Sequence, residues 1–103
     1  MKNLAALMKQ AQKMQSQLAQ IQQEMGEKRV EATAGGGMVT VVVNGRGEMV
    51  SIKIDPEVVR SGDVSMIEDL VLAAVNEARN RSEELMREAM NRVSGPFSGF
   101  PFV

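Results

Sequence analysis

Several chemically active residue types are missing from this 103-residue sequence, which contains no cysteine, histidine, tryptophan or tyrosine. The absence of cysteine excludes disulfides and thiolate nucleophiles, and the absence of histidine removes a common metal ligand and the usual acid or base near neutral pH. No nucleophile can be paired with a suitable base among the remaining residues. We therefore expect a protein that is not an enzyme and that uses no cofactor.

Long apolar runs and a strong net charge are absent too. No apolar run approaches the ~20 residues that span a bilayer, and the N-terminal segment lacks the apolar core of a signal peptide. We expect a cytoplasmic protein of one small domain, with no membrane partner and no large internal cavity for a small-molecule substrate. The net charge of −1 predicts that any DNA binding is weak and sensitive to salt.

Two patterns that suggest ligand sites fit turns and helix caps better. Three successive glycines at positions 35–37 lead into a strand and lack the Lys-Ser/Thr that follows the glycines of a phosphate-binding loop. The acidic residues between positions 55 and 69 do not have the spacing of a calcium loop, and helix capping accounts for them. We therefore expect a turn at the glycines and no metal site.

Apolar residues recur at alternating spacings of three and four in the first 25 residues. This heptad pattern predicts a helix from about Asn3 to Met25, ended by Gly26, with a narrow apolar stripe that packs against another helix. We call this stripe the N-terminal seam. It consists of Leu4, Leu7, Ala11, Met14, Leu18, Ile21 and Met25.

Residues 28–34, 38–43 and 48–54 alternate apolar and polar side chains, which predicts three short strands. The glycine-rich sequence between the last two strands predicts a tight hairpin, with Gly45 and Gly47 at positive φ. Asp55-Pro56 ends the third strand. The alternation places the following residues on one face of the sheet: Val30, Ala32, Ala34, Val39, Val41, Val43, Val50, Ile52 and Ile54.

A second long helix is predicted to begin near Ser65, where Ser65 and Glu68 fit a capping box, with Asp63 as the alternative cap. Its apolar stripe weakens at Arg81-Ser82 and then resumes. The stripe comprises Ile67, Leu70, Val71, Ala74, Ala78, Leu85, Met86 and Ala89.

The predicted fold is α+β, with one α-β-β-β-α domain over residues 1–93 and a three-stranded antiparallel meander. Residues 94–103 form a tail that contains all three phenylalanines. The tail is either a frayed end or a strap over an apolar groove. We favour docking, because exposed phenylalanine at this density is unusual.

The predicted helices are longer than the strands beside them. At 1.5 Å per residue they span ~35 and ~42 Å, whereas a strand of seven residues spans about 23 Å. Both helices must therefore extend beyond the sheet, and one helix layer on three strands gives a thin core. Because a homodimer would cover the helix seams and the sheet edges together, we expect self-association.

Basic charge is concentrated in the first helix, on the side opposite the N-terminal seam. Lys2, Lys9 and Lys13 fall within about 40° of one another at ~100° per residue, and no acidic residue precedes Glu24. These lysines are candidates for phosphate contacts. The same pattern also fits a solvated face of a coiled-coil helix.

The arginines of the second helix have acidic neighbours, so they are weaker candidates than the lysines. Arg79 has a glutamate four residues after it. The other three have one four residues before them, which is the stabilising order for an ion pair on a helix. The predicted pairs are Glu77 with Arg81, Glu83 with Arg87 and Glu88 with Arg92.

Three segments, at residues 7–15 (LMKQAQKMQ), 44–56 (NGRGEMVSIKIDP) and 68–78 (EDLVLAAVNEA), precede the tail. In this order they resemble the YbaB/EbfC family of bacterial nucleoid-associated proteins. The resemblance implies a homodimer shaped like tweezers, whose projecting helices bind double-stranded DNA. It also implies a cytoplasmic protein that organises the nucleoid and modulates transcription.

The resemblance and the charge pattern together select candidate site residues. Phosphate contacts carry little sequence information, and no aromatic residue lies near the basic face, so we expect low or shape-based specificity. The DNA-binding candidates are Lys2, Lys9, Lys13, Arg79, Arg81 and Arg87, and the candidates for the dimer or packing seam are Leu4, Leu7, Met14, Leu18, Ile21 and Leu85.

An alternative function belongs to a different class. Methionine suits adaptable surfaces, so the apolar seams of the long helices would clamp a partner protein in a non-catalytic interaction module. A stoichiometric partner that survives nuclease treatment of a lysate would favour this alternative over DNA binding.

Overall fold

The computed structural model describes residues 3–94, and these form three helices and one three-stranded sheet. The elements have the predicted α-β-β-β-α order with one additional short helix, α2. Ser94, the first residue of the predicted tail, belongs to α3, and the rest of the tail that was predicted to dock lies outside the described residues. The elements are α1 (Leu4–Glu27), β1 (Val30–Ala34), β2 (Val39–Val43), β3 (Met49–Ile54), α2 (Pro56–Arg60) and α3 (Val64–Ser94).

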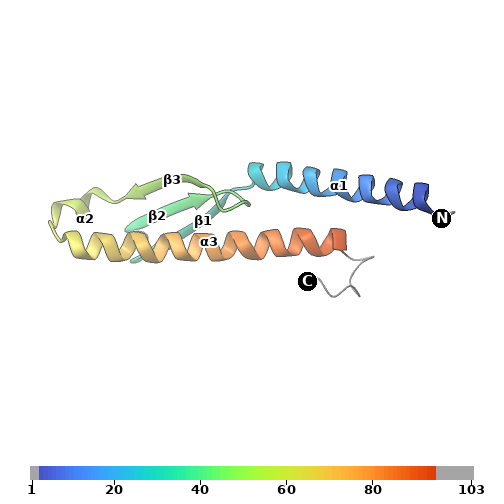
Figure 1. The fold of residues 1–103 in the computed structure, drawn as a ribbon. Coiled ribbons are helices and arrows are strands. Elements are labelled where there is room, and N and C mark those ends of the chain that lie inside the picture. The colour runs from blue at the N-terminus through green and yellow to red at the C-terminus, as the bar shows by residue number, and fades with distance from the viewer. Residues whose placement is uncertain (1–2, 95–103) are drawn as a thin grey trace.

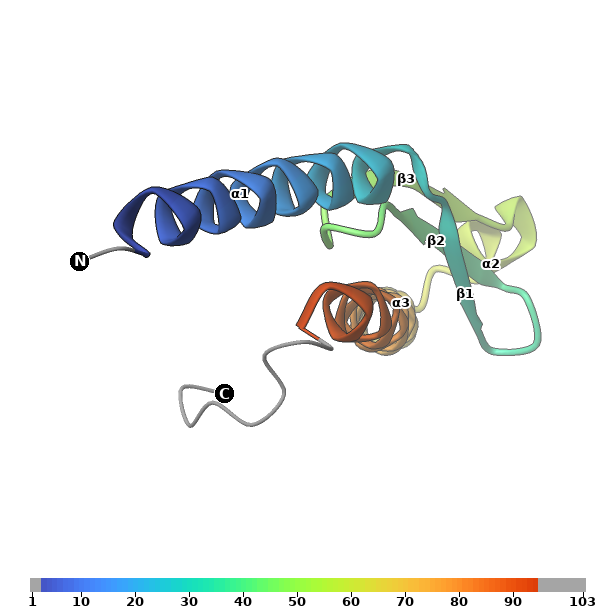
Figure 2. The same ribbon diagram turned by 90° about the vertical axis from the view of Figure 1, so that its right-hand side faces the viewer.

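The chain folds into an elongated molecule with extents of 71 × 24 × 16 Å. The strands are antiparallel in the order β1-β2-β3, and α3 runs beneath the sheet and continues past its end (Figure 1). α1 leaves that same end of the sheet and covers no strand. Figure 2 looks along α3 and shows α1 from the side, so α1 projects at an angle to α3 as a separate arm.

A small core lies between α3 and the first two strands. Val39, Val41 and Val43 point from β2 into this core and are fully buried. Ala74 and Ala78 present short side chains on the facing side of α3, so the helix approaches the sheet closely. The predicted alternation of β2 and the predicted stripe of α3 are confirmed here.

β3 pairs with β2 but lies beyond the reach of α3. Ile52 is paired with Val41 and Ile54 with Val39, so both isoleucines lie on the predicted apolar face. α3 packs on β1 and β2, and the Ile52 side chain therefore remains 48% exposed. A single chain leaves this part of its apolar sheet face uncovered.

A β-bulge shifts the pairing at the start of β3. Between Val42 and Val43 the register changes, and Met49 is the partner of Val43. Val50 is the extra residue of the bulge and has no partner on β2, so the register does not test the prediction that it continues the apolar face.

The five residues between β2 and β3, positions 44–48, form a hairpin loop that is closed by backbone hydrogen bonds. Asn44 N donates to Glu48 O at 2.9 Å, and Gly47 N donates to Asn44 O at 3.0 Å. Gly47 has φ 82°, as predicted. The Gly45 prediction is wrong, because its φ is not positive; a Cβ there would instead lie 2.8 Å from the carbonyl oxygen of Met25.

This hairpin also joins α1 to α3. Gly45 N donates to the same Met25 carbonyl at 2.8 Å, at the end of α1. The buried Ser82 of α3 donates its Oγ hydrogen to Asn44 O at 2.9 Å. The weak point in the predicted stripe of α3 is therefore a polar contact that positions the hairpin.

Beyond Ser82, α3 packs against the last turns of α1. Ile21 and Met25 of α1 are buried with Ala89 of α3 in a second apolar cluster. Leu85 is partly buried and packs on this cluster. The C-terminal end of the N-terminal seam thus packs against a helix, as the heptad pattern predicted.

The first long helix ends later than predicted. α1 continues through Gly26 to Glu27. The glycine at this position makes room for Arg46, since a Cβ on Gly26 would lie 2.6 Å from Arg46 Nη2. Gly26 is therefore a close-contact position and not a helix stop.

The second long helix begins one residue before the predicted start. Asp63 is its cap, because its Oδ1 accepts a hydrogen bond from Met66 N at 3.0 Å. The capping box at Ser65 is therefore wrong, and the alternative cap is confirmed. The short α2 was not predicted, although Asp55 and Pro56 form a usual helix start, in which Asp55 Oδ1 accepts from Glu57 N at 3.0 Å.

We expect Ser82→Ala to lower the free energy of unfolding by about 1 kcal/mol, because it removes one buried hydrogen bond to the hairpin. Urea unfolding at one fixed protein concentration measures this. Ser65→Ala, an exposed change on the same helix, is the matched control and should stay within about 0.5 kcal/mol of the wild type. Equal stability of the two variants would contradict the role assigned to Ser82.

Candidate nucleic-acid interface

The projecting arm α1 has free cationic groups. Lys9 and Lys13 are exposed, and within residues 3–94 neither takes part in a hydrogen bond or an ion pair. Lys2, the third predicted lysine, lies outside the described residues. The described part of α1 has no acidic residue before Glu24, so nothing on the arm neutralises these ammonium groups.

The N-terminal seam is buried at one end only. Ile21 and Met25 are buried and Met14 and Leu18 are partly buried, whereas Leu7 is 60% exposed. Leu4 and Ala11 are exposed as well. The arm therefore presents two different surfaces, an apolar one along the seam and a basic one on the opposite side.

Arg81 holds α3 to the sheet. Its Nε lies 2.9 Å from Glu77 Oε1, which confirms the predicted ion pair, and its Nη1 donates to the carbonyl oxygen of Glu31 in β1 at 2.8 Å. Both contacts are exposed at the surface. Arg81 thus already has one carboxylate and one backbone partner within the fold.

The other predicted pairs on α3 differ from the expectation. Arg87 pairs with Glu84, three residues before it, at 3.0 Å, and not with Glu83. Residues three and four apart are both neighbours on a helix surface, so sequence spacing does not choose between the two glutamates. Among residues 3–94, Arg79 and Arg92 form no ion pair, so the predicted pair of Glu88 with Arg92 is wrong.

Arg46 in the hairpin is a basic residue that the sequence analysis did not select. Its Nε lies 3.0 Å from Glu48 Oε1, and its Nη1 donates to Gln22 O in α1 at 3.3 Å. Asn44 Nδ2 donates to the same Glu48 oxygen at 2.6 Å. The hydrogen bond from Asn44, followed by the hydrogen bond and the charge of Arg46, lowers the pKa of the Glu48 carboxyl below its ordinary value.

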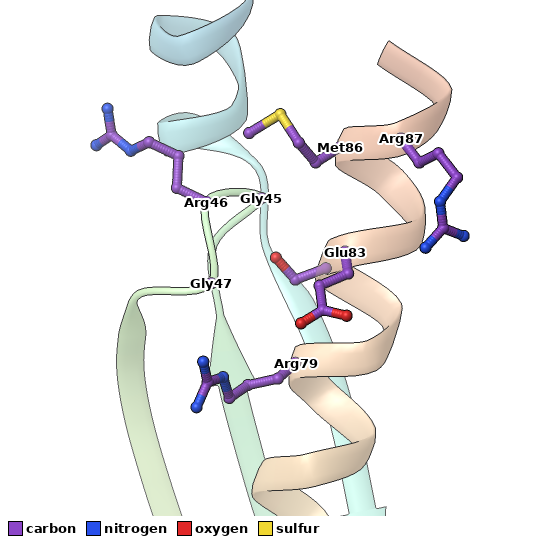
Figure 3. Close-up of a pocket in the computed structure, with 8 residues that line it drawn as sticks. Gly45, Arg46, Gly47, Arg79, Glu83, Met86 and Arg87 are labelled. Carbon is purple, nitrogen blue, oxygen red and sulfur yellow. The ribbon is translucent and has the colours of Figure 1, made fainter. Parts of the chain in front are cut away.

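An open cavity of about 360 Å³ lies between the hairpin and α3, and Arg46, Arg79 and Arg87 are among its lining residues. Figure 3 shows that Arg79 points from α3 toward the hairpin. Arg46 extends from the hairpin away from α3, and Arg87 extends from α3 on the side away from the hairpin. Glu83 also lines the cavity. The three guanidinium groups therefore do not converge on one anion.

Metal clusters and membrane-spanning helices are both missing from the described residues. Residues 3–94 contain no group of three acidic side chains close enough to hold a metal ion. None of the helices described is long and apolar enough to span a bilayer. The triple glycine is a turn, with all three residues at positive φ, as predicted.

We expect the Glu48 carboxyl to titrate below the ordinary glutamate range, and Arg46→Ala to move its pKa upward. Because the pKa is lower in the folded hairpin than in the unfolded chain, the ionised carboxylate stabilises the hairpin above the ordinary pKa. That contribution is lost as the pH falls through the lowered value. The carboxyl carbon shift of Glu48, followed by NMR against pH, measures both midpoints. Identical midpoints in the two proteins would exclude the contribution of Arg46.

Comparison with known proteins identifies relatives across nearly the whole chain. The model of the YbaB/EbfC DNA-binding family matches residues 1–97. A nucleoid-associated protein of Thermodesulfovibrio yellowstonii is 56% identical over 97 residues, which cover 94% of this chain and 85% of that protein. One from Moorella thermoacetica is 54% identical over 95 residues, which cover 92% and 91%. The resemblance inferred from three sequence segments is confirmed.

A solved structure has the same fold. The crystal structure of the uncharacterized protein HP0035 from Helicobacter pylori matches with a TM-score of 0.74 and 25% sequence identity. The match covers 92% of this chain and 94% of that chain. The predicted α+β fold class is therefore confirmed.

Proposed function

The chain belongs to the YbaB/EbfC DNA-binding family, and from that premise we propose that it is a non-catalytic, homodimeric nucleoid-associated protein. Its α1 arms bind double-stranded DNA through phosphate contacts. The observation that supports this most directly is the pair of exposed ammonium groups, Lys9 and Lys13, without a partner on a projecting helix.

The proposed contacts are electrostatic and have little sequence preference. Lysines on one helix face meet phosphates, which all base sequences share, and the described residues include no aromatic side chain to stack on a base. With roughly four to six phosphates neutralised per dimer, the slope of log K against log salt concentration is about −4 to −5. Binding of this kind suits a protein that coats and organises the nucleoid and modulates transcription by occupying DNA.

Two arginines of α3, Arg81 and Arg87, rank below the lysines as DNA contacts. Arg81 and Arg87 already have ion-pair partners, and Arg81 also binds the backbone of β1. A phosphate would have to compete with these glutamates. Lys2, on the same face of the predicted helix as Lys9 and Lys13, joins them in the proposed contact surface.

Self-association is supported by the apolar surface that one chain leaves open. Leu4 and Leu7 on α1, together with Ile52 on β3, are about half exposed or more. Exposed apolar side chains that line up along one element, as Leu4 and Leu7 do on the seam, form the kind of continuous patch that marks an interface. A homodimer also doubles the number of lysine-bearing arms that bind one duplex.

We expect Lys9→Ala/Lys13→Ala to weaken binding to a duplex at low salt by at least about tenfold and to reduce the magnitude of the salt slope by about 3 to 4, since four lysines per dimer are lost. Mobility-shift titrations at several salt concentrations measure both quantities.

The matched control for this experiment is Lys28→Ala/Lys53→Ala. It removes the same charge from two exposed lysines on the remaining part of the domain, and it should change affinity by no more than about threefold, the effect of net charge alone. Equal losses in the two variants would contradict a contact surface on α1.

We expect the wild-type chain to sediment at twice the 11.2 kDa mass of one chain at micromolar concentration. A stable, well-folded single chain would contradict the homodimer. Capture from a nuclease-treated lysate tests the alternative function: a stoichiometric protein partner bound through the exposed half of the seam would favour the interaction module over DNA binding.

A further inference from the structure

One side of α3 is exposed next to β3, the strand that α3 does not cover. Glu68, Leu72, Val75 and Arg79 follow one another at spacings of four, three and four, which aligns them in one stripe along the helix. We call these four residues the α3 flank. Arg79 points from this flank toward the hairpin that leads into β3 (Figure 3), so the flank lies on the β3 side of α3.

The α3 flank is only partly covered within one chain. Leu72 is 61% exposed, and Val75 is only partly buried against the core. Within residues 3–94, neither Glu68 nor Arg79 forms an ion pair, although glutamates elsewhere on α3 pair with Arg81 and Arg87. Two apolar side chains thus stand between two unpaired charges of opposite sign.

The order of residues along the α3 flank is self-complementary. Glu68 and Arg79 are equally far, in sequence, from the midpoint between Leu72 and Val75. When two such helices lie antiparallel about a two-fold axis at this midpoint, each Glu68 meets the partner's Arg79 and each Leu72 meets the partner's Val75. A two-fold interface requires one patch that complements itself in this way.

We propose that the α3 flank is the surface on which a second copy of this chain packs, with α3 antiparallel to the partner's α3. This inference rests on the proposed homodimer and specifies where its subunits meet. The exposed Ile52 of β3 lies on the sheet face that looks toward α3 and is covered by the same approach. The lysines of both α1 arms remain free for DNA.

Other occupants fit the α3 flank less well. A polyanion is disfavoured by Glu68 within the flank and by the adjacent Asp69, since neither carboxylate has an ion-pair partner among the described residues. A foreign protein would need its own complementary pattern. A second copy of this chain supplies the matching charges and apolar residues in the required order.

A charge swap tests this proposal. Glu68→Arg and Arg79→Glu each place like charges opposite one another at both ends of the interface, so each weakens dimerisation by at least about tenfold. The double variant Glu68→Arg/Arg79→Glu restores opposite charges and brings the dimer dissociation constant back to within about threefold of the wild type. Sedimentation over a concentration series measures all four proteins, and circular dichroism shows that each is folded.

The matched control is Asp69→Arg, which makes the same charge change one residue away and about 100° around the helix. It should leave the dimer unchanged. Mobility shifts on the same proteins separate two roles of Arg79: duplex binding returns in the double variant if Arg79 joins subunits, and stays lost if Arg79 touches DNA, which would overturn the proposal.

The outcomes distinguish failure of this interface from failure of the proposed homodimer. If the wild type is a dimer and both single variants dimerise as tightly as the wild type, the α3 flank is not the interface. The homodimer then forms through another surface. If the double variant dimerises as weakly as the single variants, the proposed pairing is overturned. A monomeric wild type that binds DNA through Lys9 and Lys13 would overturn the homodimer and this inference together.

Discussion

The structure depends on the docking of one hairpin between two helices. Gly45 binds the last turn of α1 through its N–H, and Asn44 accepts a hydrogen bond from the buried Ser82 of α3. α1 has no sheet beneath it (Figure 1), so these contacts and a small apolar cluster around Ile21 and Met25 set the direction of the arm. Without them, α1 would have no defined position relative to the domain.

The way in which basic residues are used divides the molecule into two parts. Arg46 in the hairpin and Arg81 in α3 each bind a carboxylate and a backbone carbonyl, and so hold elements together. On the arm, Lys9 and Lys13 bind nothing within the described chain. An ammonium group without an internal partner is available to a phosphate, and a projecting helix brings it to the surface of a duplex. This contrast supports the arm as the DNA-binding element.

The uncovered apolar surface follows from the thin core. One helix covers two of three strands, because α3 is a single layer and β3 lies beyond its width. The exposed face of β3 and the α3 flank lie together on that side, while the exposed half of the N-terminal seam lies on the arm. The surface proposed for subunit contact and the surface proposed for DNA are therefore on separate parts of the molecule, so one need not block the other.

The sequence by itself determined the elements whose pattern is local. Heptad spacing in α1, alternation in β2 and the glycine-rich loops predicted the order and nature of the main elements, and the family followed from three short segments. Asp55-Pro56 was a local signal for α2 that the sequence analysis did not use. The unpaired lysines of α1 were also visible, because no acidic residue lies near them in sequence.

Only the tertiary structure decided what depends on contacts between distant residues. Spacing could not show that Gly45 and Gly26 are glycines because Met25 and Arg46 approach them, nor that Ser82 interrupts the stripe of α3 to bind the hairpin. It also could not show that β3 lies outside the cover of α3, or that Arg87 chooses Glu84 over Glu83. Periodicity reports which face of an element is apolar, but the packing of the other elements determines how much of that face is buried and which charges remain free.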